Sequence, residues 1–326
     1  MRYIDVDGRR VSVIGLGCWQ FGSRAWDFDK VVTEEGAEAI IQRALDLGVT
    51  LLDTAEVYGR GRSELIVGRV LAPRRPPQGP APWFLATKFT PLVPVPRVLV
   101  RHCTASLQRL RVPQVALYQI HWPNPLVPLR RQMAGLRQVM RAGLVEHAGV
   151  SNFSLARWRA ADRALGRPVL ANQVRYNLLQ RGPERRLLPF AAREGRLIIA
   201  YSPLAQGLLG GRYAPEAFPS DVRRTNPLFT AANYHRAAPV LEALRAVAAA
   251  HGATPAQVAL AYLIAQPRVV VIPGARSVAQ LESNVAAADL VLSPAELRQL
   301  RLAADRFQPD RVRSGLELGR GLLRRP

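Results

Sequence analysis

The chain has 326 residues, of which 48% are hydrophobic, and a formal net charge of +21. This length and apolar content suffice for one large core, and an α/β barrel of this size commonly forms a single domain. The sequence has no uninterrupted run of about 18 apolar residues, the length that spans a membrane. Residues 1–13 carry several charged side chains, whereas a signal peptide needs an apolar core there. We therefore expect a soluble, cytoplasmic protein without a membrane partner.

The basic charge comes almost entirely from arginine. Only two of the 45 basic residues, Lys30 and Lys88, are lysines. A strongly basic balance is also typical of nucleic-acid binding, but here the arginines are spread over the whole chain, with no basic helix and no alternation of basic and aromatic residues. We expect no nucleic-acid partner. A lysine retained at position 88 indicates a site that needs a compact, titratable ammonium, which arginine does not provide.

Strand-like and helix-like segments alternate along the chain. Two short β-branched segments flank Asp7 and Gly8, a strong hairpin turn signal, and predict an opening β-hairpin. Eight apolar strands are predicted over residues 13–17, 49–53, 83–89, 115–121, 145–151, 169–173, 197–202 and 269–272. Helices are predicted over residues 33–47, 63–71, 97–110, 129–142, 155–164, 184–193, 239–266 and 278–287.

This alternation predicts an α/β fold. Near-continuous apolar strands separated by amphipathic helices indicate a parallel sheet covered by helices, and eight such units predict a closed (β/α)8 TIM barrel after the N-terminal hairpin. We expect one barrel domain over residues 1–307 and a basic, partly disordered tail over residues 308–326. The proline-rich insertion at residues 73–82 precedes a strand, so it belongs to the face opposite the strand ends.

Polar residues mark the ends of consecutive strands, where active residues of this architecture lie. Asp53 ends the second strand, Lys88 lies near the end of the third and His121 ends the fourth, while Tyr58 follows Asp53 closely. Tyrosine is a poor acid because its pKa is about 10, but a nearby ammonium stabilises the phenolate and lowers that pKa. We predict general acid catalysis by Tyr58, assisted by Lys88. Asp53 would keep the lysine charged and fixed, and His121 would donate to or orient a polar atom of the substrate.

Seven short motifs in this order resemble the aldo-keto reductase family, from residue 13 to about residue 307. They are Asp-Thr-Ala-Glu-Val-Tyr-Gly at 53–59, Thr-Lys at 87–88, Gln-Ile-His-Trp-Pro at 119–123, Gly-Val-Ser-Asn-Phe at 149–153, Asn-Gln-Val-Arg-Tyr-Asn at 172–177, Tyr-Ser-Pro-Leu-Ala-Gln-Gly-Leu-Leu at 201–209 and Ile-Pro-Gly-Ala-Arg-Ser at 272–277. The resemblance implies a barrel that reduces aldehydes or ketones with NADPH and needs no metal. The family's catalytic tetrad maps onto Asp53, Tyr58, Lys88 and His121 without a substitution.

A cofactor site follows partly from chemistry and partly from the resemblance. Asn152 and Gln173 can both donate and accept, as a nicotinamide carboxamide requires, and Ser151 adds a hydroxyl. The resemblance implies that Tyr201 stacks on the nicotinamide and that Arg276, at a helix N-terminus, binds the 2′-phosphate, so that NADPH is preferred over NADH. The other cofactor residues expected are Ser202, Pro203, Leu204, Gln206 and Gly207 near the pyrophosphate, and Ile272, Gly274, Ser277, Gln280 and Asn284 near the adenosine half.

Structural interpretations remain open beside these roles. Asn152 and Gln173 could be ordinary caps at strand ends, and Ser277 with Gln280 could be a helix capping box. Both roles can coexist. The segment at residues 293–296 has the same capping pattern with no motif nearby, and we interpret it as structural.

The substrate pocket is less well defined by the sequence. Trp19 and Trp122 lie at strand ends and are candidate pocket walls, although buried packing is the usual role of tryptophan. The loops at residues 23–32 and 210–237, and the segments after residues 89 and 307, carry no readable motif. Arg212, Arg223 and Arg224 would attract an anionic substrate, but arginine is too common here for this to identify one.

A second function of another class stays open. Some members of the family are cofactor-sensing regulatory subunits of membrane channels, so the chain could bind NADPH and act as a regulatory or redox-sensing protein with little turnover. The complete tetrad favours the enzyme. Its small-molecule carbonyl substrate is not identified by the sequence, and the oligomeric state is open between a monomer and a homo-oligomer.

Overall fold

A computed structural model of the chain describes residues 1–211, 213, 218 and 221–310. Eight parallel strands lie at its centre, each hydrogen-bonded to the next in chain order. They are β3 (Leu16–Gly17), β4 (Leu51–Asp53), β5 (Phe84–Phe89), β6 (Val115–Ile120), β7 (Val145–Ser151), β8 (Ala171–Arg175), β9 (Leu197–Tyr201) and β10 (Val269–Val271). The backbone N–H of Gly15 donates to the carbonyl of Val271 at 2.8 Å, which brings the start of the first strand against the last and closes the barrel.

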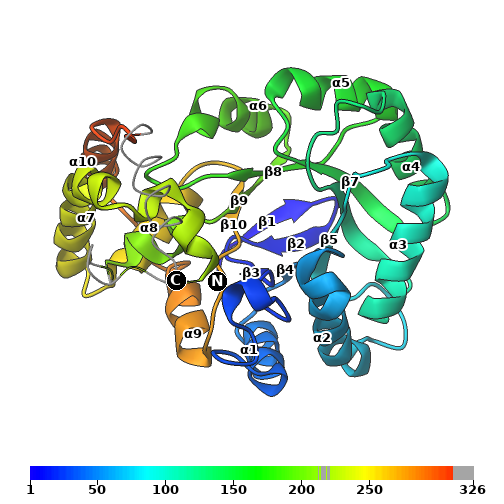
Figure 1. The fold of residues 1–326 in the computed structure, drawn as a ribbon, viewed down its shortest axis with the longest axis horizontal. Helices are drawn as coiled ribbons and strands as arrows, with labels where there is room; N and C mark the ends of the chain where they lie inside the picture. Colours follow the sequence, from blue (N-terminus) through cyan, green and yellow to red (C-terminus); the bar gives the residue numbers. More distant parts are fainter. Residues whose placement is uncertain (212, 214–217, 219–220, 311–326) are drawn as a thin grey trace, which may run out of the picture.

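Helices surround the strands and pack their apolar faces on them (Figure 1). Each connection between strands carries at least one helix, as expected for parallel strands that need a crossover. The helices are α1 (Glu34–Asp46), α2 (Arg62–Leu71), α3 (Pro96–Leu110), α4 (Leu129–Arg141), α5 (Leu155–Leu165), α6 (Leu187–Arg193), α7 (Ala231–Ala250), α8 (Pro255–Ile264), α9 (Val278–Ala286) and α10 (Pro294–Asp305). The predicted (β/α)8 TIM barrel is confirmed.

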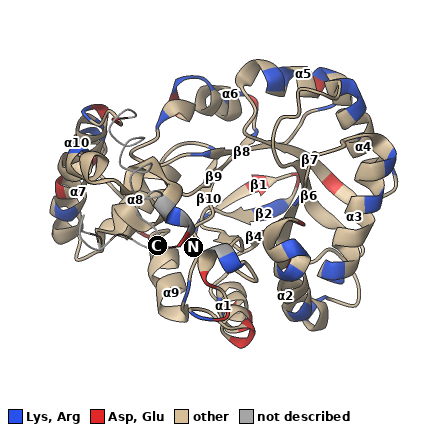
Figure 2. Ribbon diagram, viewed as in Figure 1, with Lys and Arg blue, Asp and Glu red and all other residues tan. Residues whose placement is uncertain are grey.

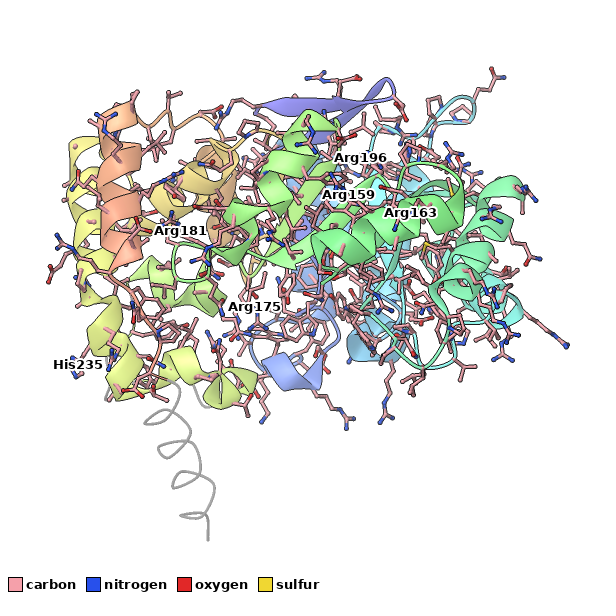
Figure 3. The ribbon with its side chains drawn as sticks, turned by 90° about the horizontal axis from the view of Figure 1, so that it is seen from above. Arg159, Arg163, Arg175, Arg181, Arg196 and His235 are labelled. Carbon is pink, nitrogen blue, oxygen red and sulfur yellow. The ribbon has the colours of Figure 1, made fainter. Side chains whose placement is uncertain are left out.

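The N-terminal hairpin of β1 (Tyr3–Val6) and β2 (Arg9–Ser12) covers the end of the barrel where the strands begin. Its Val6 and Val11 belong to the same buried cluster as the residues that fill the barrel interior. Arg9 donates to the carbonyls of Ala81 and Trp83 just before β5, which confirms that the proline-rich insertion lies on this face. In the side view of Figure 3, Arg196, which precedes β9, lies toward the hairpin, and Arg175, at the end of β8, lies toward the opposite face. The strand ends are therefore free to build a site there.

The prediction of a single helix over residues 239–266 is wrong. Helix α7 starts earlier, at Ala231, and ends at Ala250, and α8 follows after Gly252, which has a φ of +59°. Thr254 caps α8 with Gln257 in a capping box, so the chain restarts in a new direction. Among the described residues, no single helix is long and apolar enough to cross a membrane, and α7 and α8 reach that length and composition only together, across a bend of 94°.

Helix α10 was not predicted, although its capping box was interpreted correctly as structural: Ser293 and Glu296 bond each other's backbone at its start. Its packing against α7 places it outside the ring of barrel helices (Figure 1). Most of the tail predicted to be partly disordered, from residue 311 onward, lies outside the described residues.

Lysine and arginine residues are distributed over the outer helices around the barrel (Figure 2). Several are paired: Glu34 accepts from Arg62 at 2.6 Å and from Arg69 at 2.5 Å. Exposed pairs of this kind contribute little to stability individually. They show where some of the arginines are neutralised locally, and the net charge of +21 is what remains after every acidic residue is counted.

Candidate active site

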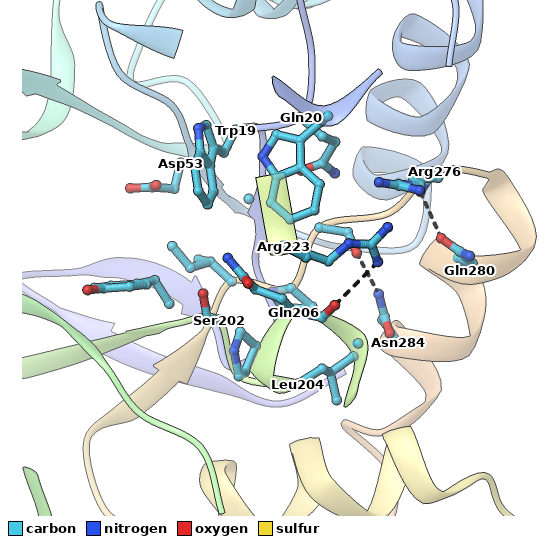
Figure 4. Close-up of a pocket in the computed structure, with 18 of the residues that line it drawn as sticks. Trp19, Gln20, Asp53, Ser202, Leu204, Gln206, Arg223, Arg276, Gln280 and Asn284 are labelled. Carbon is cyan, nitrogen blue, oxygen red and sulfur yellow. Dashed lines mark hydrogen bonds between the residues drawn. The ribbon is translucent and has the colours of Figure 1, made fainter. Parts of the chain in front are cut away.

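A cavity of about 980 Å³ opens at the carboxyl ends of the strands. Figure 4 shows its two halves, with Trp19 and Asp53 on one side and Arg276, Gln280 and Asn284 on the other. Every predicted site residue lines this cavity except Lys88. They are Trp19, Asp53, Tyr58, His121, Trp122, Ser151, Asn152, Gln173, Tyr201, Ser202, Pro203, Leu204, Gln206, Gly207, Ile272, Gly274, Arg276, Ser277, Gln280 and Asn284.

Lys88 is fully buried behind the cavity wall and connects three groups. Its ammonium donates to Asp53 Oδ1 at 2.5 Å, to the Thr54 carbonyl at 2.9 Å and to Tyr58 Oη at 3.2 Å. All three N–H groups of the ammonium are thus used. The Tyr58 ring lies 5.6 Å from the His121 ring between centroids, so the four tetrad residues meet at one point.

The buried ion pair sets the charge state of this cluster. Burial alone would lower the pKa of Lys88, but Asp53 and Tyr58 outweigh it and the pKa lies above its ordinary value. Burial raises the pKa of Tyr58 by more than the Lys88 ammonium lowers it, so the net direction is upward. The expected effect of Lys88 is present, but the expectation of a lowered Tyr58 pKa is wrong, because it left out the desolvation of the hydroxyl. The Tyr58 phenol is therefore protonated at neutral pH, and it lies beside a charged Lys88.

His121 is neutral at physiological pH. Burial, with the Lys88 charge, lowers its pKa to about 3. Its Nδ1 is buried and has no hydrogen-bond partner among the described residues. The imidazole can therefore act on a substrate only as a neutral donor or acceptor.

Aromatic rings form the wall next to the tetrad. Trp19 stands 6.1 Å from Tyr58 and 5.1 Å from Trp26, between ring centroids, and Trp122 stands 4.9 Å from His121. Trp19 is 36% exposed, so it is not a packed core residue. The placement of Trp19 and Trp122 in the cavity agrees with their predicted role as walls, which stays a prediction.

The predicted nicotinamide residues are tied to one another. Tyr201 donates from its hydroxyl to Asn152 Oδ1 at 3.0 Å, and Asn152 donates to Ser151 Oγ at 3.1 Å. Gln173 donates from Nε2 to Asp53 Oδ2 at 2.7 Å, which leaves its carbonyl oxygen as an acceptor. Asn152 has a φ of +59°, an uncommon conformation that asparagine tolerates better than most residues. Hydrogen bonds at the ends of β7 and β8 therefore hold the side-chain amides of Asn152 and Gln173 in place.

The loop after β9 holds an uncommon backbone conformation. Ser202, Ala205 and Gln206 have φ values of +49°, +48° and +57°, and Gly207 has +99°. Left-handed backbone costs about 1 kcal/mol or more for residues other than glycine and tends to gather at ligand sites. This is the loop to which the sequence assigns the pyrophosphate.

The far end of the cavity has a charged cluster that includes Arg276. Its guanidinium donates to Asp221 at 3.0 Å, and Asp221 also pairs with Arg223 at 2.5 Å. Gln280 Oε1 accepts from the backbone N–H of Arg276 at 2.9 Å, and Asn284 donates to the Gly274 carbonyl at 3.3 Å. Arg276 is thus held at the start of α9, as predicted.

Arg223, one of the arginines that the sequence offers as an attractor of an anionic substrate, lines the cavity. It is buried, bound to Asp221, and lies 5.5 Å above the Trp26 ring. Arg212 lies outside the described residues, and nothing is described of the Arg224 side chain. Asp221 pairs with Arg276 as well, so an ion pair with Asp221 does not decide the role of either arginine, and the role of Arg223 stays a prediction.

Sequence reasoning missed three polar residues near the site. Gln20 donates to the Ala275 carbonyl at 2.9 Å, Gln119 donates to Asp53 Oδ2 at 3.3 Å, and Asp221 pairs with Arg276. Gln119 carried a usable signal, because it lies two residues before His121 in the predicted strand over residues 115–121, where alternate residues share a face. The other two depend on loop conformation and had no such signal.

These observations define a class of protein: a (β/α)8 barrel with an acid–base cluster at the carboxyl ends of its strands. The aldo/keto reductase family model matches residues 13–305. The chain belongs to the aldo/keto reductase family, and it is an oxidoreductase of that family.

Individual proteins show the same relationship. A Mycobacterium tuberculosis protein named only as an uncharacterized oxidoreductase is 51% identical over 310 residues, covering 95% of this chain and 94% of its own length. The structure of a glycerol dehydrogenase from Gluconobacter oxydans is similar with a TM-score of 0.82 at 27% identity, covering 95% of this chain and 97% of its own. An aldo/keto reductase from Klebsiella pneumoniae, solved with NADP and acetate, matches with a TM-score of 0.73 at 30% identity, covering 95% of this chain and 96% of its own.

Proposed function

We propose that the protein reduces an aldehyde or ketone to an alcohol with NADPH, and that Tyr58 donates the proton. The observation that carries this proposal is the buried Lys88 ammonium, which binds Asp53 and Tyr58 at once, at the wall of a cavity lined by His121. NADPH, when bound, supplies a hydride to the carbonyl carbon. Tyr58 then protonates the carbonyl oxygen.

The residues of the cavity fit the cofactor. The cavity volume of about 980 Å³ lies at the upper end of the range for ligand pockets. That range reaches about 1,000 Å³. Asn152 and Gln173 would hold the carboxamide, Tyr201 would support one face of the ring, and Arg276 would face the 2′-phosphate. The Klebsiella pneumoniae relative solved with NADP supports the choice of cofactor.

The developing oxyanion would lie between Tyr58 and His121. A neutral imidazole donates a hydrogen bond there without competing with Tyr58 for the proton, because its pKa is about 3. Preorganised donors in a site that excludes water lower the barrier more than the same donors in bulk water. Oxidation of an alcohol follows the same path in reverse, with the phenolate of Tyr58 as the base.

The reaction is tested by following NADPH absorbance with a panel of aldehydes, ketones and quinones. Rapid multiple turnover with at least one carbonyl compound is the expected result. Tight NADPH binding with negligible turnover across the panel would instead support a regulatory or redox-sensing protein. The panel also ranks the substrates, whose identity the cavity does not determine.

We expect Arg276→Ala to weaken NADPH binding by about 10- to 100-fold, because a charged hydrogen bond contributes roughly 1.5–3 kcal/mol. NADH lacks the 2′-phosphate, so its binding should change little. Arg163→Ala is the control, since Arg163 is an exposed arginine on α5 that does not line the cavity. Dissociation constants from fluorescence titration with both cofactors provide the measurement. If the variant lost the same affinity for NADPH and for NADH, Arg276 would not be the residue that binds the 2′-phosphate.

A further inference from the structure

Asp53 is held by three donors from three different strands. Lys88 on β5 bonds Oδ1, whereas Gln173 on β8 and Gln119 on β6 both bond Oδ2, at 2.7 Å and 3.3 Å. One carboxylate oxygen therefore faces the ammonium, and the other faces two amides. The amides fix the rotation of the carboxylate about its last side-chain bond.

The barrel makes room for Gln119. Gln119 is fully buried and pairs in register with Lys88 on one side and with Gly149 of β7 on the other. A Cβ atom at Gly149 would lie 2.8 Å from Gln119 Cγ and 3.0 Å from Leu117 Cδ1, closer than real contacts allow. Only glycine at this position leaves space for the glutamine side chain in its observed orientation.

A glutamine at position 119 also lowers the stability of the fold. Its Oε1 is buried and has no hydrogen-bond partner among the described residues. An unsatisfied buried acceptor destabilises the fold, whereas an apolar side chain of the same size would not. Within the described part of the chain, the one side-chain hydrogen bond of Gln119 goes to Asp53. A role at Asp53 accounts for a polar group that packing alone does not.

We propose that Gln119 is a positioning residue that fixes Asp53 Oδ2, so that Oδ1 stays on Lys88 and an N–H of Lys88 stays on Tyr58. The second amide, on Gln173, is the one that the proposed function assigns to the nicotinamide. Gln119 thus supplies a donor to Asp53 that does not depend on the cofactor. The inference rests on the proposed role of Tyr58 as the proton donor.

The charged and titratable groups around Tyr58 determine whether its pKa rises or falls when Gln119 is replaced. Lys88 lowers the Tyr58 pKa, Asp53 and Tyr201 raise it, and His121 faces it as a neutral ring. If Asp53 turns and draws Lys88 away from the phenol, the pKa of Tyr58 rises. In alcohol oxidation, where the phenolate is the base, the acidic limb of the pH–rate profile then moves to higher pH.

The test is Gln119→Met, which keeps the volume of the side chain and removes the donor. We expect kcat to fall about tenfold while KM for substrate and for NADPH stays nearly unchanged, as for a residue that aligns the reacting groups. The acidic limb of the oxidation profile should move upward. Gln119→Glu should be most active at low pH, where its added carboxyl is protonated and can donate to Asp53.

A double-mutant cycle separates positioning from packing. Gly149→Ala should reproduce the kinetic loss, because the new methyl group displaces Gln119. In a Gln119→Ala background the same substitution should lower kcat by less, since the contact with Gln119 Cγ at 2.8 Å is gone and only the contact with Leu117 Cδ1 at 3.0 Å remains. If the losses in kcat from the two substitutions were additive in free energy, Gly149 would act independently of Gln119.

Failure of this inference is distinguishable from failure of the proposed function. A wild-type protein without turnover would overturn the function, whereas an active wild type matched by Gln119→Met in kcat and pH profile would overturn only the role of Gln119. Ultraviolet titration of the phenolate gives a readout that needs no turnover, with Tyr58→Phe identifying the signal. We expect Tyr58 to titrate at higher pH in Gln119→Met, and an unchanged titration would count against the positioning role.

Discussion

Replacing Tyr58 with phenylalanine should abolish carbonyl reduction and leave NADPH binding nearly unchanged. The phenol oxygen accepts a hydrogen bond from Lys88 at 3.2 Å, so its own proton is free to pass to a substrate. A positioned general acid contributes roughly 100- to 10,000-fold, and we expect a loss of about 1,000-fold in kcat. Phenylalanine keeps the ring and its packing against Trp19 and His121, so the cavity keeps its shape.

A matched control is available on β6. Tyr118→Phe removes a buried hydroxyl that has no hydrogen-bond partner among the described residues and does not line the cavity. Its activity should equal that of the wild type. Stopped-flow measurement of NADPH oxidation gives the rate, and fluorescence titration gives cofactor affinity. Undiminished turnover in Tyr58→Phe would remove the tyrosine from its assigned role.

Much of the architecture could be predicted from the sequence because the barrel repeats one local pattern. Most of the apolar strands carry a polar residue at or next to their carboxyl end, and parallel strands bring these ends to one face. Asp53, Lys88 and His121 could therefore be placed together without knowing any distance. The same reasoning brought the residues of the cofactor site into one cavity.

One error overlooked a local signal, and the others arose where long-range contacts decide the outcome. The helix expected over residues 239–266 is broken because the Thr254 capping box restarts the chain, a signal masked by the apolar stretches on both sides. The pKa of Tyr58 depends on how deeply its hydroxyl is buried, and burial is a property of the assembled barrel. Asp221 reaches Arg276 from 55 residues away in the chain, and no spacing rule indicates that pair.

Lys88 is the position where catalysis and stability should be separable. It is fully buried and bound to Asp53, which is itself only 2% exposed. Removing one partner of a buried ion pair leaves an uncompensated charge and costs about 3–5 kcal/mol. We therefore expect Lys88→Met to lose both activity and stability, the second measured as the free energy of unfolding in urea.

The double variant Asp53→Asn/Lys88→Met should recover most of that stability and none of the activity. It buries no isolated charge, and replacing a whole buried pair by neutral groups is often close to neutral in free energy. Reduction still fails because no ammonium stabilises the phenolate that Tyr58 becomes once its proton has left. Recovery of turnover in the double variant would show that the pair serves folding alone.

Lys88→Arg tests whether the site needs an ammonium or only a positive charge. Arginine keeps the charge, but its planar guanidinium is larger and cannot place three N–H groups on Asp53 Oδ1, the Thr54 carbonyl and Tyr58 Oη from a single nitrogen. We expect kcat to fall by about 100-fold or more, as a misplaced catalytic group commonly causes. Activity near that of the wild type would mean that geometry at the ammonium is unimportant, which would contradict the arrangement on which the proposed proton transfer depends.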